Sequence, residues 1–170
     1  MDRFISANSV CPLITEEFEG WLTSIGYYNK PASLHYHGMR SGDLYAHCLE
    51  VGTQLTMMTE KLGLVWEREE SPMLVGLLHD ICKCDDYVFD GRRRKFVSNK
   101  RKSDGHGSKS VLMLKNRIDL TDEEIACIRY HMGAFTEKED WAGYTKAVKK
   151  YPNVLWAHTA DMVASQILGI

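Results

Sequence analysis

The sequence has few of the features that would place a protein outside the ordinary globular class. Only 4 of its 170 residues are proline, and no Pro-, Ser- or Gly-rich linker or internal repeat divides it. A chain of this length can form one hydrophobic core unaided, so we predict a single domain over residues 1–170. No apolar run approaches the roughly 18 residues of a membrane span. The N-terminus, Met-Asp-Arg-Phe-Ile, lacks the apolar core of a secretory signal. We therefore predict a cytoplasmic protein with no membrane partner.

The sequence also lacks the cysteine pattern of a disulfide scaffold or a zinc ribbon. It lacks the excess of positive charge that is typical of a DNA-coating protein. The 5 cysteines are irregularly spaced, and Cys82 and Cys84 form C-x-C rather than C-x-x-C. We predict reduced thiols packed in the core. A net charge of −2 disfavours wholesale binding of nucleic acid. The sequence has no Walker A loop, Gly-rich dinucleotide loop or G-x-S-x-G motif, so the chemistry must rest on other groups.

Apolar residues at helical spacing dominate what is present. Helices are predicted over about 12–24, 43–62, 71–81, 106–116, 121–131, 137–150 and 152–168. The helix from Ser71 is apolar nearly all round, which predicts a central buried helix. Tyr-Val-Phe, then Asp90-Gly91, then Arg-Arg-Arg-Lys-Phe-Val predicts a β-hairpin with a type I′ turn. The predicted fold is all-α, a bundle of about six or seven helices with one small β-hairpin.

A histidine and an aspartate stand side by side where the predicted central helix ends, in Leu77-Leu-His-Asp-Ile-Cys-Lys83. Burying both among Leu and Ile is costly unless something compensates them, and a metal ion compensates both at once. Alone, this dipeptide would more often mark a helix end that reaches solvent. Further candidate ligands stand one per predicted helix, separated by roughly a helix plus a loop: His47, His106, His131 and Asp161. A bundle that converges on a central metal site needs such an arrangement.

The ordered histidines and aspartates resemble the ligand set of the HD superfamily of metal-dependent phosphohydrolases, and the extra histidines resemble its two-metal members. Four phrases are similar to a bacterial and phage subgroup: Pro31-Ala-Ser-Leu-His-Tyr-His-Gly, Gly105-His-Gly-Ser-Lys-Ser-Val, Ile128-Arg-Tyr-His-Met-Gly and Ala160-Asp-Met-Val-Ala-Ser. The resemblance covers roughly residues 27–168. It implies a helical HD fold and two divalent ions that share a hydroxide and clamp the phosphoryl oxygens during in-line attack.

The resemblance also implies which residues hold the metal. The first ion would be held by His47, His79, Asp80 and Asp161, and Asp80 would bridge to a second ion held by His106 and His131. A histidine-rich set favours Mn, Fe, Co, Ni or Zn, although Mg would also be accommodated.

Four further residues are predicted to handle the substrate. Lys83 lies one helical turn after His79, which predicts a charge beside the phosphate or the leaving group. His37 resembles a family position that faces the pocket, where it would contact phosphate or protonate the leaving oxygen. Arg40 and Lys109 are predicted to bind phosphate. The predicted catalytic set is Asp80, Lys83 and His37, and the predicted substrate-binding set is His37, Arg40, Lys83 and Lys109.

Three functions remain open at this point. We first predict a phosphohydrolase that attacks phosphate esters or anhydrides of a small-molecule nucleotide with a metal-bound hydroxide. The alternative is a 3′–5′ exonuclease or phosphodiesterase on RNA or DNA, which is less favoured because such HD exonucleases typically carry a further nucleic-acid-binding domain. The third is a non-catalytic nucleotide-binding HD protein. The basic run Arg92-Arg-Arg-Lys95, with Lys100-Arg-Lys102, is either a solvated hairpin or a flap beside a phosphate site. A homo-oligomer is compatible with all three.

Overall fold

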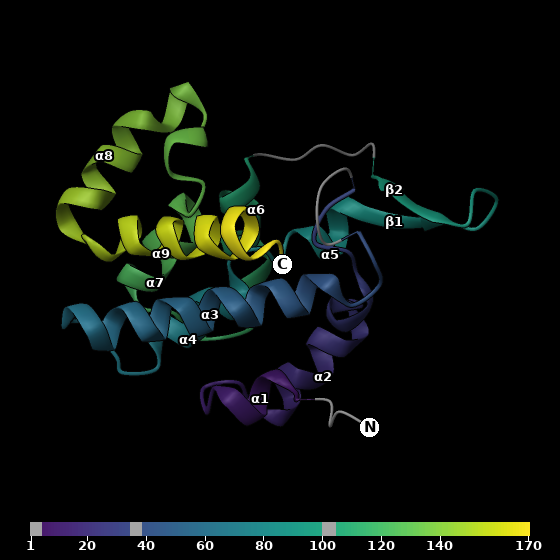
Figure 1. Ribbon diagram of the computed structural model, residues 1–170, viewed down its shortest axis with the longest axis horizontal. Helices are drawn as coiled ribbons and strands as arrows, with labels where there is room; N and C mark the ends of the chain where they lie inside the picture. Colours follow the sequence, from purple (N-terminus) through teal and green to yellow (C-terminus); the bar gives the residue numbers. More distant parts are fainter. Residues whose placement is uncertain (1–4, 35–38, 100–104) are drawn as a thin grey trace.

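The computed structural model describes residues 5–34, 39–99 and 105–170, and in these ranges it is a bundle of helices with one hairpin (Figure 1). The helices are α1 (Ala7–Val10), α2 (Glu16–Ser24), α3 (Asp43–Leu62), α4 (Ser71–Leu78), α5 (Lys83–Asp86), α6 (His106–Leu114), α7 (Asp122–Tyr130), α8 (Trp141–Lys150) and α9 (Asn153–Met162). The strands are β1 (Tyr87–Asp90) and β2 (Lys95–Ser98). Helix α9 continues into a π-helix, η4 (Val163–Leu168). The prediction of an all-α fold with a small hairpin is confirmed, and every segment predicted to be helical contains a helix.

Helix boundaries follow local capping chemistry. Helix α2 begins at Glu16 rather than at Pro12, because the Thr15 hydroxyl accepts a hydrogen bond from the Phe18 amide and caps the helix. Gly63 ends α3 in the left-handed conformation with φ 64°. The Thr121–Glu124 capping box that opens α7 is present with both of its hydrogen bonds.

The hairpin is confirmed, but the predicted type I′ turn is wrong. Strands β1 and β2 pair antiparallel from Tyr87 opposite Ser98 to Asp90 opposite Lys95, which leaves residues 91–94 as a four-residue loop. The carboxylate of Asp90 accepts hydrogen bonds from the amides of Arg92 and Arg93 at 2.9 and 3.1 Å. Asp90 therefore caps a longer loop from the last position of β1 instead of occupying the centre of a two-residue turn.

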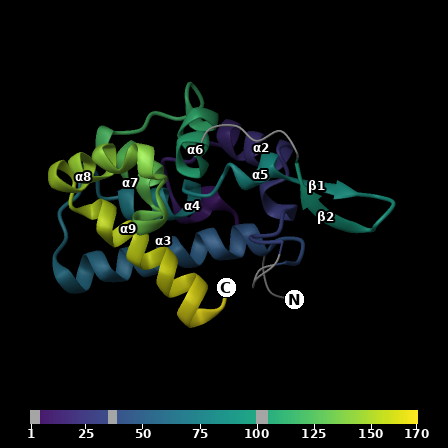
Figure 2. The same cartoon turned by 90° about the horizontal axis from the view of Figure 1, so that it is seen from above.

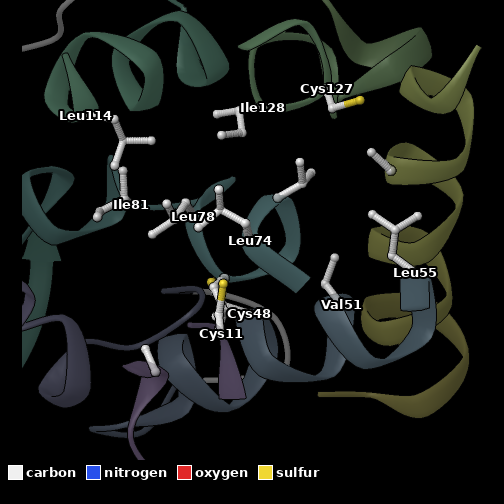
Figure 3. Close-up of a cluster of buried hydrophobic side chains, with 14 of the residues drawn as sticks. Cys11, Cys48, Val51, Leu55, Leu74, Leu78, Ile81, Leu114, Cys127 and Ile128 are labelled. Atoms are coloured by element: carbon white, nitrogen blue, oxygen red, sulfur yellow. The ribbon is translucent and has the colours of Figure 1, made fainter. Parts of the chain in front are cut away.

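Helix α4 forms the centre of the core, as its apolar sequence predicts. Leu74, Leu78 and Ile81 are fully buried. Figure 3 shows them between Val51 of α3 and Ile128 of α7. Burying an aliphatic side chain of this size contributes roughly 1.5–3 kcal/mol, so this layer holds the surrounding helices together. All five cysteines are buried and unpaired, which confirms their predicted place in the core. Among the described residues, no helix has the length and apolar character needed to cross a membrane.

Two close backbone contacts set the spacing of the helices around the site. A Cβ on Gly76 of α4 would lie 2.2 Å from the Cα of Gly52 in α3, so these two helices touch backbone to backbone. A Cβ on Gly107 of α6 would lie 2.1 Å from the carbonyl oxygen of Arg129 in α7. Any larger residue at Gly76 or Gly107 would force the helices apart. The two contacts bring the candidate ligands at neighbouring helix ends within reach of one another.

Candidate metal centre

The six predicted ligands come from five segments and converge on Asp80. His47 lies near the start of α3, and His79 and Asp80 follow the last residue of α4. His106 is the first residue of α6, His131 follows α7, and Asp161 is near the end of α9. Among the described residues, four groups have ligand atoms within 4.8 Å of one another. Three consist of predicted ligands: His47, His79 and Asp80; His79, His131 and Asp161; and Asp80, His106 and His131. The fourth joins His106 to Cys82 and Asp86, which were not predicted. The sequence spacing therefore predicted correctly that the six predicted ligands meet.

The two oxygens of Asp80 face different pairs of histidines. Its Oδ2 lies 3.7 Å from His47 Nε2 and 3.5 Å from His79 Nε2. Its Oδ1 lies 2.5 Å from His106 Nε2 and 3.5 Å from His131 Nε2. A carboxylate with both oxygens directed at separate imidazole pairs has the form that a bridging ligand needs.

Asp161 completes the side of the cluster that contains His47. Its Oδ1 lies 3.2 Å from His47 Nε2. Burial would raise the pKa of Asp161, but the hydrogen bond from His47 and the nearby His79 and His131 lower it to about 2. Asp161 is therefore a carboxylate at neutral pH, as a metal ligand must be.

Backbone carbonyl groups fix the orientation of three imidazole rings. His79 Nδ1 lies 2.7 Å from the Gly76 carbonyl, His131 Nδ1 lies 2.8 Å from the Ile128 carbonyl, and His47 Nδ1 lies 3.0 Å from the Ile170 carbonyl. A carbonyl oxygen only accepts, so each Nδ1 carries a proton. Each Nε2 then donates to a carboxylate when its ring is protonated, and presents its lone pair to the cluster when its ring is neutral. The neutral form is the tautomer with which histidine binds metal through Nε2.

The donor set fits a divalent metal, and the clearest sign is an unpartnered atom. The buried Nε2 of His79 has no hydrogen-bond partner. Burial lowers the pKa of His79, so the ring is neutral and its lone pair is directed towards Asp80 with no proton between them. Lone pairs that converge in a buried space are costly unless a cation accepts them. Neutral imidazole and carboxylate together favour a transition metal or zinc.

Lys83 lies at the same carboxylate, as its position one turn after His79 predicts. Its Nζ makes an ion pair with Asp80 Oδ2, and it lines the adjacent cavity. Burial alone would lower the pKa of Lys83, but Asp80 raises it above the ordinary value. Burial would likewise raise the pKa of Asp80, but the Lys83 ammonium and the hydrogen bond from His106 hold it well below its usual range. Lys83 therefore acts as a fixed positive charge at the edge of the cluster.

The other predicted substrate residues are placed differently. The Nζ of Lys109 lies 2.5 Å from Asp85 Oδ2 and 2.6 Å from Asp86 Oδ1, and Lys109 does not line the cavity. Arg40 is exposed and also lies outside the cavity wall. Phosphate binding by these two residues stays a prediction that the structure does not support. His37 lies outside the described residues.

A cavity of about 880 Å³ opens beside the cluster. It exposes His47, Asp80, His106, His131, Asp161 and Lys83. Its wall also contains residues that the sequence analysis did not predict as site residues: Tyr87, Ser98, Phe135, Met162, Ser165 and Gln166. Ser165 and Gln166 belong to the π-helix η4, a helix form that often marks functional sites and that no composition signal announced. His158 also lines the cavity, and its Nδ1 lies 2.8 Å from the His131 carbonyl.

Comparison with known families agrees with this geometry. The family model described as the HD domain matches residues 44–163, which is well over half of the chain and includes all six ligands. No curated protein and no solved structure matches the chain. From the family match together with the His/Asp cluster, we conclude that the chain belongs to the HD-domain family, within the superfamily of metal-dependent phosphohydrolases.

Proposed function

We propose that the protein hydrolyses phosphate esters or anhydrides of a nucleotide, and that it does so with two divalent metal ions. The observation that carries this proposal is the unpartnered Nε2 of His79 in a cluster of converging imidazole and carboxylate groups at the wall of an 880 Å³ cavity. When bound, a metal pair supplies a Lewis acid and a hydroxide nucleophile at neutral pH.

The arrangement around Asp80 supports two ions rather than one. In this proposal, His47, His79, Asp80 and Asp161 would hold one ion. Asp80, His106 and His131 would hold the other. His106 is the most exposed side chain of the second set, at 28%, and Asp161 is the most exposed of the first, at 18%, so the second site is the more open of the two. An open position beside a metal is where a substrate oxygen binds.

Lys83 is proposed to stabilise the phosphate. Its ammonium neutralises Asp80 in the metal-free protein. Cations bound at Asp80 would take over that role and repel the ammonium. The side chain, already in the cavity wall, would then meet the phosphoryl oxygens or the leaving group.

The cavity wall supports a nucleotide as the substrate. A volume of about 880 Å³ lies in the range of ligand pockets, roughly 300–1,000 Å³. Phe135 and Met162 offer apolar surface for a base, and the Gln166 amide can both donate to and accept from its edge. These groups lie on the same cavity as the charged cluster, so a phosphate and a base can be bound together.

The test is a phosphate-release screen over nucleoside mono-, di- and triphosphates with Mn, Fe, Co, Ni, Zn and Mg, repeated with Asp80→Ala. We expect release with a transition metal and none with the variant. Nucleotide binding without release under every metal would show a non-catalytic binding protein instead. Release that Asp80→Ala leaves unchanged would come from a contaminant and would contradict the proposal.

A further inference from the structure

The hairpin projects away from the helices, and Figures 1 and 2 show this from two directions. Its base is nevertheless anchored. The Asn99 amide donates to the Asp86 carbonyl at 2.7 Å, its side chain donates to the Asp85 carbonyl at 3.1 Å, and Lys30 Nζ donates to the Tyr87 carbonyl at 2.5 Å. The direction of the hairpin relative to the cavity is therefore set by hydrogen bonds at its root.

One face of the hairpin is continuous with the wall of the cavity. Alternate residues of a strand share a face, so the register puts Tyr87, Phe89, Phe96 and Ser98 on the same side. Tyr87 and Ser98 line the cavity. Phe89 and Phe96 follow outwards in edge-to-face contact, with ring centroids 5.4 Å apart, and Phe89 is 59% exposed. A row of aromatic rings thus leads from the cavity towards the hairpin tip.

The row ends at a strongly basic loop. Arg92, Arg93 and Arg94 are all exposed, and Lys95 adjoins them. Their nearest opposing charge is Asp90, whose Oδ2 lies 3.6 Å from Arg93 Nε. The chain as a whole carries a net charge of −2, so this concentration of positive charge is local to the hairpin tip.

The loop is too far from the metal centre to attract the phosphates of a mononucleotide bound there. A strand rises about 3.3 Å per residue, so Asp90 lies about 10 Å beyond Tyr87 and the loop lies farther out. The Debye length at physiological salt is about 8 Å, so the loop charges are largely screened from a phosphate at Asp80. These charges can act only on a ligand that extends along the hairpin.

We propose that this face, the hairpin track (Tyr87, Phe89, Phe96 and the loop arginines), binds single-stranded nucleic acid whose end lies in the cavity. Unpaired bases stack on the exposed rings, and the phosphates pair with the arginines. The inference rests on the proposed function, because the cavity is where the scissile phosphate would lie. It names the substrate as a nucleotide at the end of a strand. A duplex fits less well, since its bases are stacked on one another and leave no free face for Phe89.

The experiment measures binding of labelled oligothymidylate and oligouridylate phosphorothioates, which resist cleavage, at lengths of 3 and 12 nucleotides. We expect the 12-mer to bind more tightly than the 3-mer. Phe89→Ala should weaken 12-mer binding about fivefold or more, because stacking contributes roughly 1–3 kcal/mol per base. Phe89→Trp should restore it. Arg92→Gln with Arg94→Gln removes two phosphate contacts and should make the salt dependence shallower by about 1.4 in log–log slope.

Matched controls separate the track from general effects. Val88→Ala alters the neighbouring residue on the opposite face, which is 40% exposed. Lys146→Gln with Lys149→Gln removes two exposed charges from α8. Both controls should bind the 12-mer like the unaltered protein. Equal affinity for the 3-mer and the 12-mer, or an equal loss in Val88→Ala, would overturn the track. Tighter, hairpin-dependent binding to phosphatidylserine vesicles than to the 12-mer would overturn it in favour of a membrane surface.

The two proposals fail in different ways. Protein that binds the 12-mer through Phe89 but, with every metal, hydrolyses neither free nucleotides nor an unmodified 12-mer would refute the proposed function and leave binding by the track standing. Protein that releases phosphate from mononucleotides and binds 3-mer and 12-mer alike would refute the track alone.

Discussion

The metal centre and the pair Glu123–Glu124 both bury carboxylates in the same bundle, but their surroundings differ. Glu124 is fully buried and accepts hydrogen bonds from the Ser71 hydroxyl at 2.8 Å, the Thr121 amide at 2.8 Å and Arg68 Nε at 3.0 Å. Glu123 accepts from the Glu67 amide and the Asn153 side chain, each at 2.9 Å. Every contact of this glutamate pair is with a donor.

At the metal centre, Lys83 donates to Asp80, and the other described partners of Asp80 are imidazole nitrogens, which donate only when protonated. The Nε2 atoms of His47, His79 and His131 all face the carboxylates, and His79 Nε2 has no hydrogen-bond partner. A buried polar group surrounded by donors ties elements together, here the segment before α4 to the starts of α7 and α9. A buried carboxylate that faces the Nε2 lone pair of a neutral imidazole is incomplete without a cation. The comparison separates a structural cluster from a reactive one, and the following predictions test it.

The largest effect should come from Asp80. Asp80→Ala removes the group that faces both histidine pairs, so turnover in the phosphate-release assay should fall by a hundredfold or more, which corresponds to about 3 kcal/mol or more. His106→Ala removes one ligand of one pair and should cost less. Elemental analysis should show less metal bound in Asp80→Ala than in His106→Ala. Near-normal turnover of Asp80→Ala on a verified substrate would contradict the two-metal mechanism.

The glutamate pair should affect stability instead. Glu124→Ala leaves the Arg68 charge and the Ser71 hydroxyl unpaired and removes the capping box. Arg68 is partly exposed, so the loss should be near the lower end for a broken buried pair, about 3 kcal/mol by urea unfolding. Metal content should not change. Glu60→Ala, at an exposed position of α3, is the control and should unfold like the unaltered protein. A loss of bound metal in Glu124→Ala would contradict the claim that the glutamate pair has only a structural role.

Removing the metal should destabilise the protein, because a bound ion would link the helices that carry its ligands. The ligands come from separate helices, so a bound ion joins them, and free metal at about 100 times Kd adds about 2.7 kcal/mol to the native state. For a domain of this size, chelation should lower Tm by roughly 5–10 °C. Asp80→Ala should respond much less to chelator. An unchanged Tm in unaltered protein that has verifiably lost its metal would show that the metal does not stabilise the fold.

The smallest effect concerns acid stability of the metal-free protein. The pKa of Asp161 is about 2 in the folded state, below its ordinary value of 3.8, because His47, His79 and His131 outweigh burial. A lowered pKa adds stability above pH 3.8, and this contribution is lost as the pH falls towards 2. The gap in unfolding free energy between the unaltered chain and Asp161→Asn should therefore shrink by up to about 2 kcal/mol between pH 5 and pH 2. A constant gap would show that Asp161 is not paired without metal.

The sequence predicted which histidines and aspartates meet, because each stands at a helix end or in an otherwise apolar helix; their role as metal ligands stays a prediction. His47, His79 and Asp161 interrupt apolar periodicity, and the spacing of one ligand per helix needs no knowledge of packing. The same reasoning could not foresee that Lys109 pairs with Asp85 and Asp86, because these residues are far apart in sequence and meet only through the fold.

Other features also depended on tertiary structure. The π-helix that presents Gln166 has no sequence signature, and the exposed Phe89 looks like any strand residue until the register is known. The turn at Asp90 was misjudged because Asp-Gly suits a type I′ turn, whereas the Asp90 carboxylate caps a four-residue loop.

The contact between Gly52 and Gly76 has a consequence for how the protein can change. His47 lies five residues before Gly52, and His79 lies three residues after Gly76. The contact between the two glycines therefore helps to set the distance between the two imidazoles. Metal–ligand distances tolerate only about 0.2 Å. A methyl group at Gly76 would push α3 and α4 apart and so change the distance between His47 and His79. We therefore expect a substitution at Gly76 to change which metals the cluster accepts, although neither glycine contacts the cluster with a side chain.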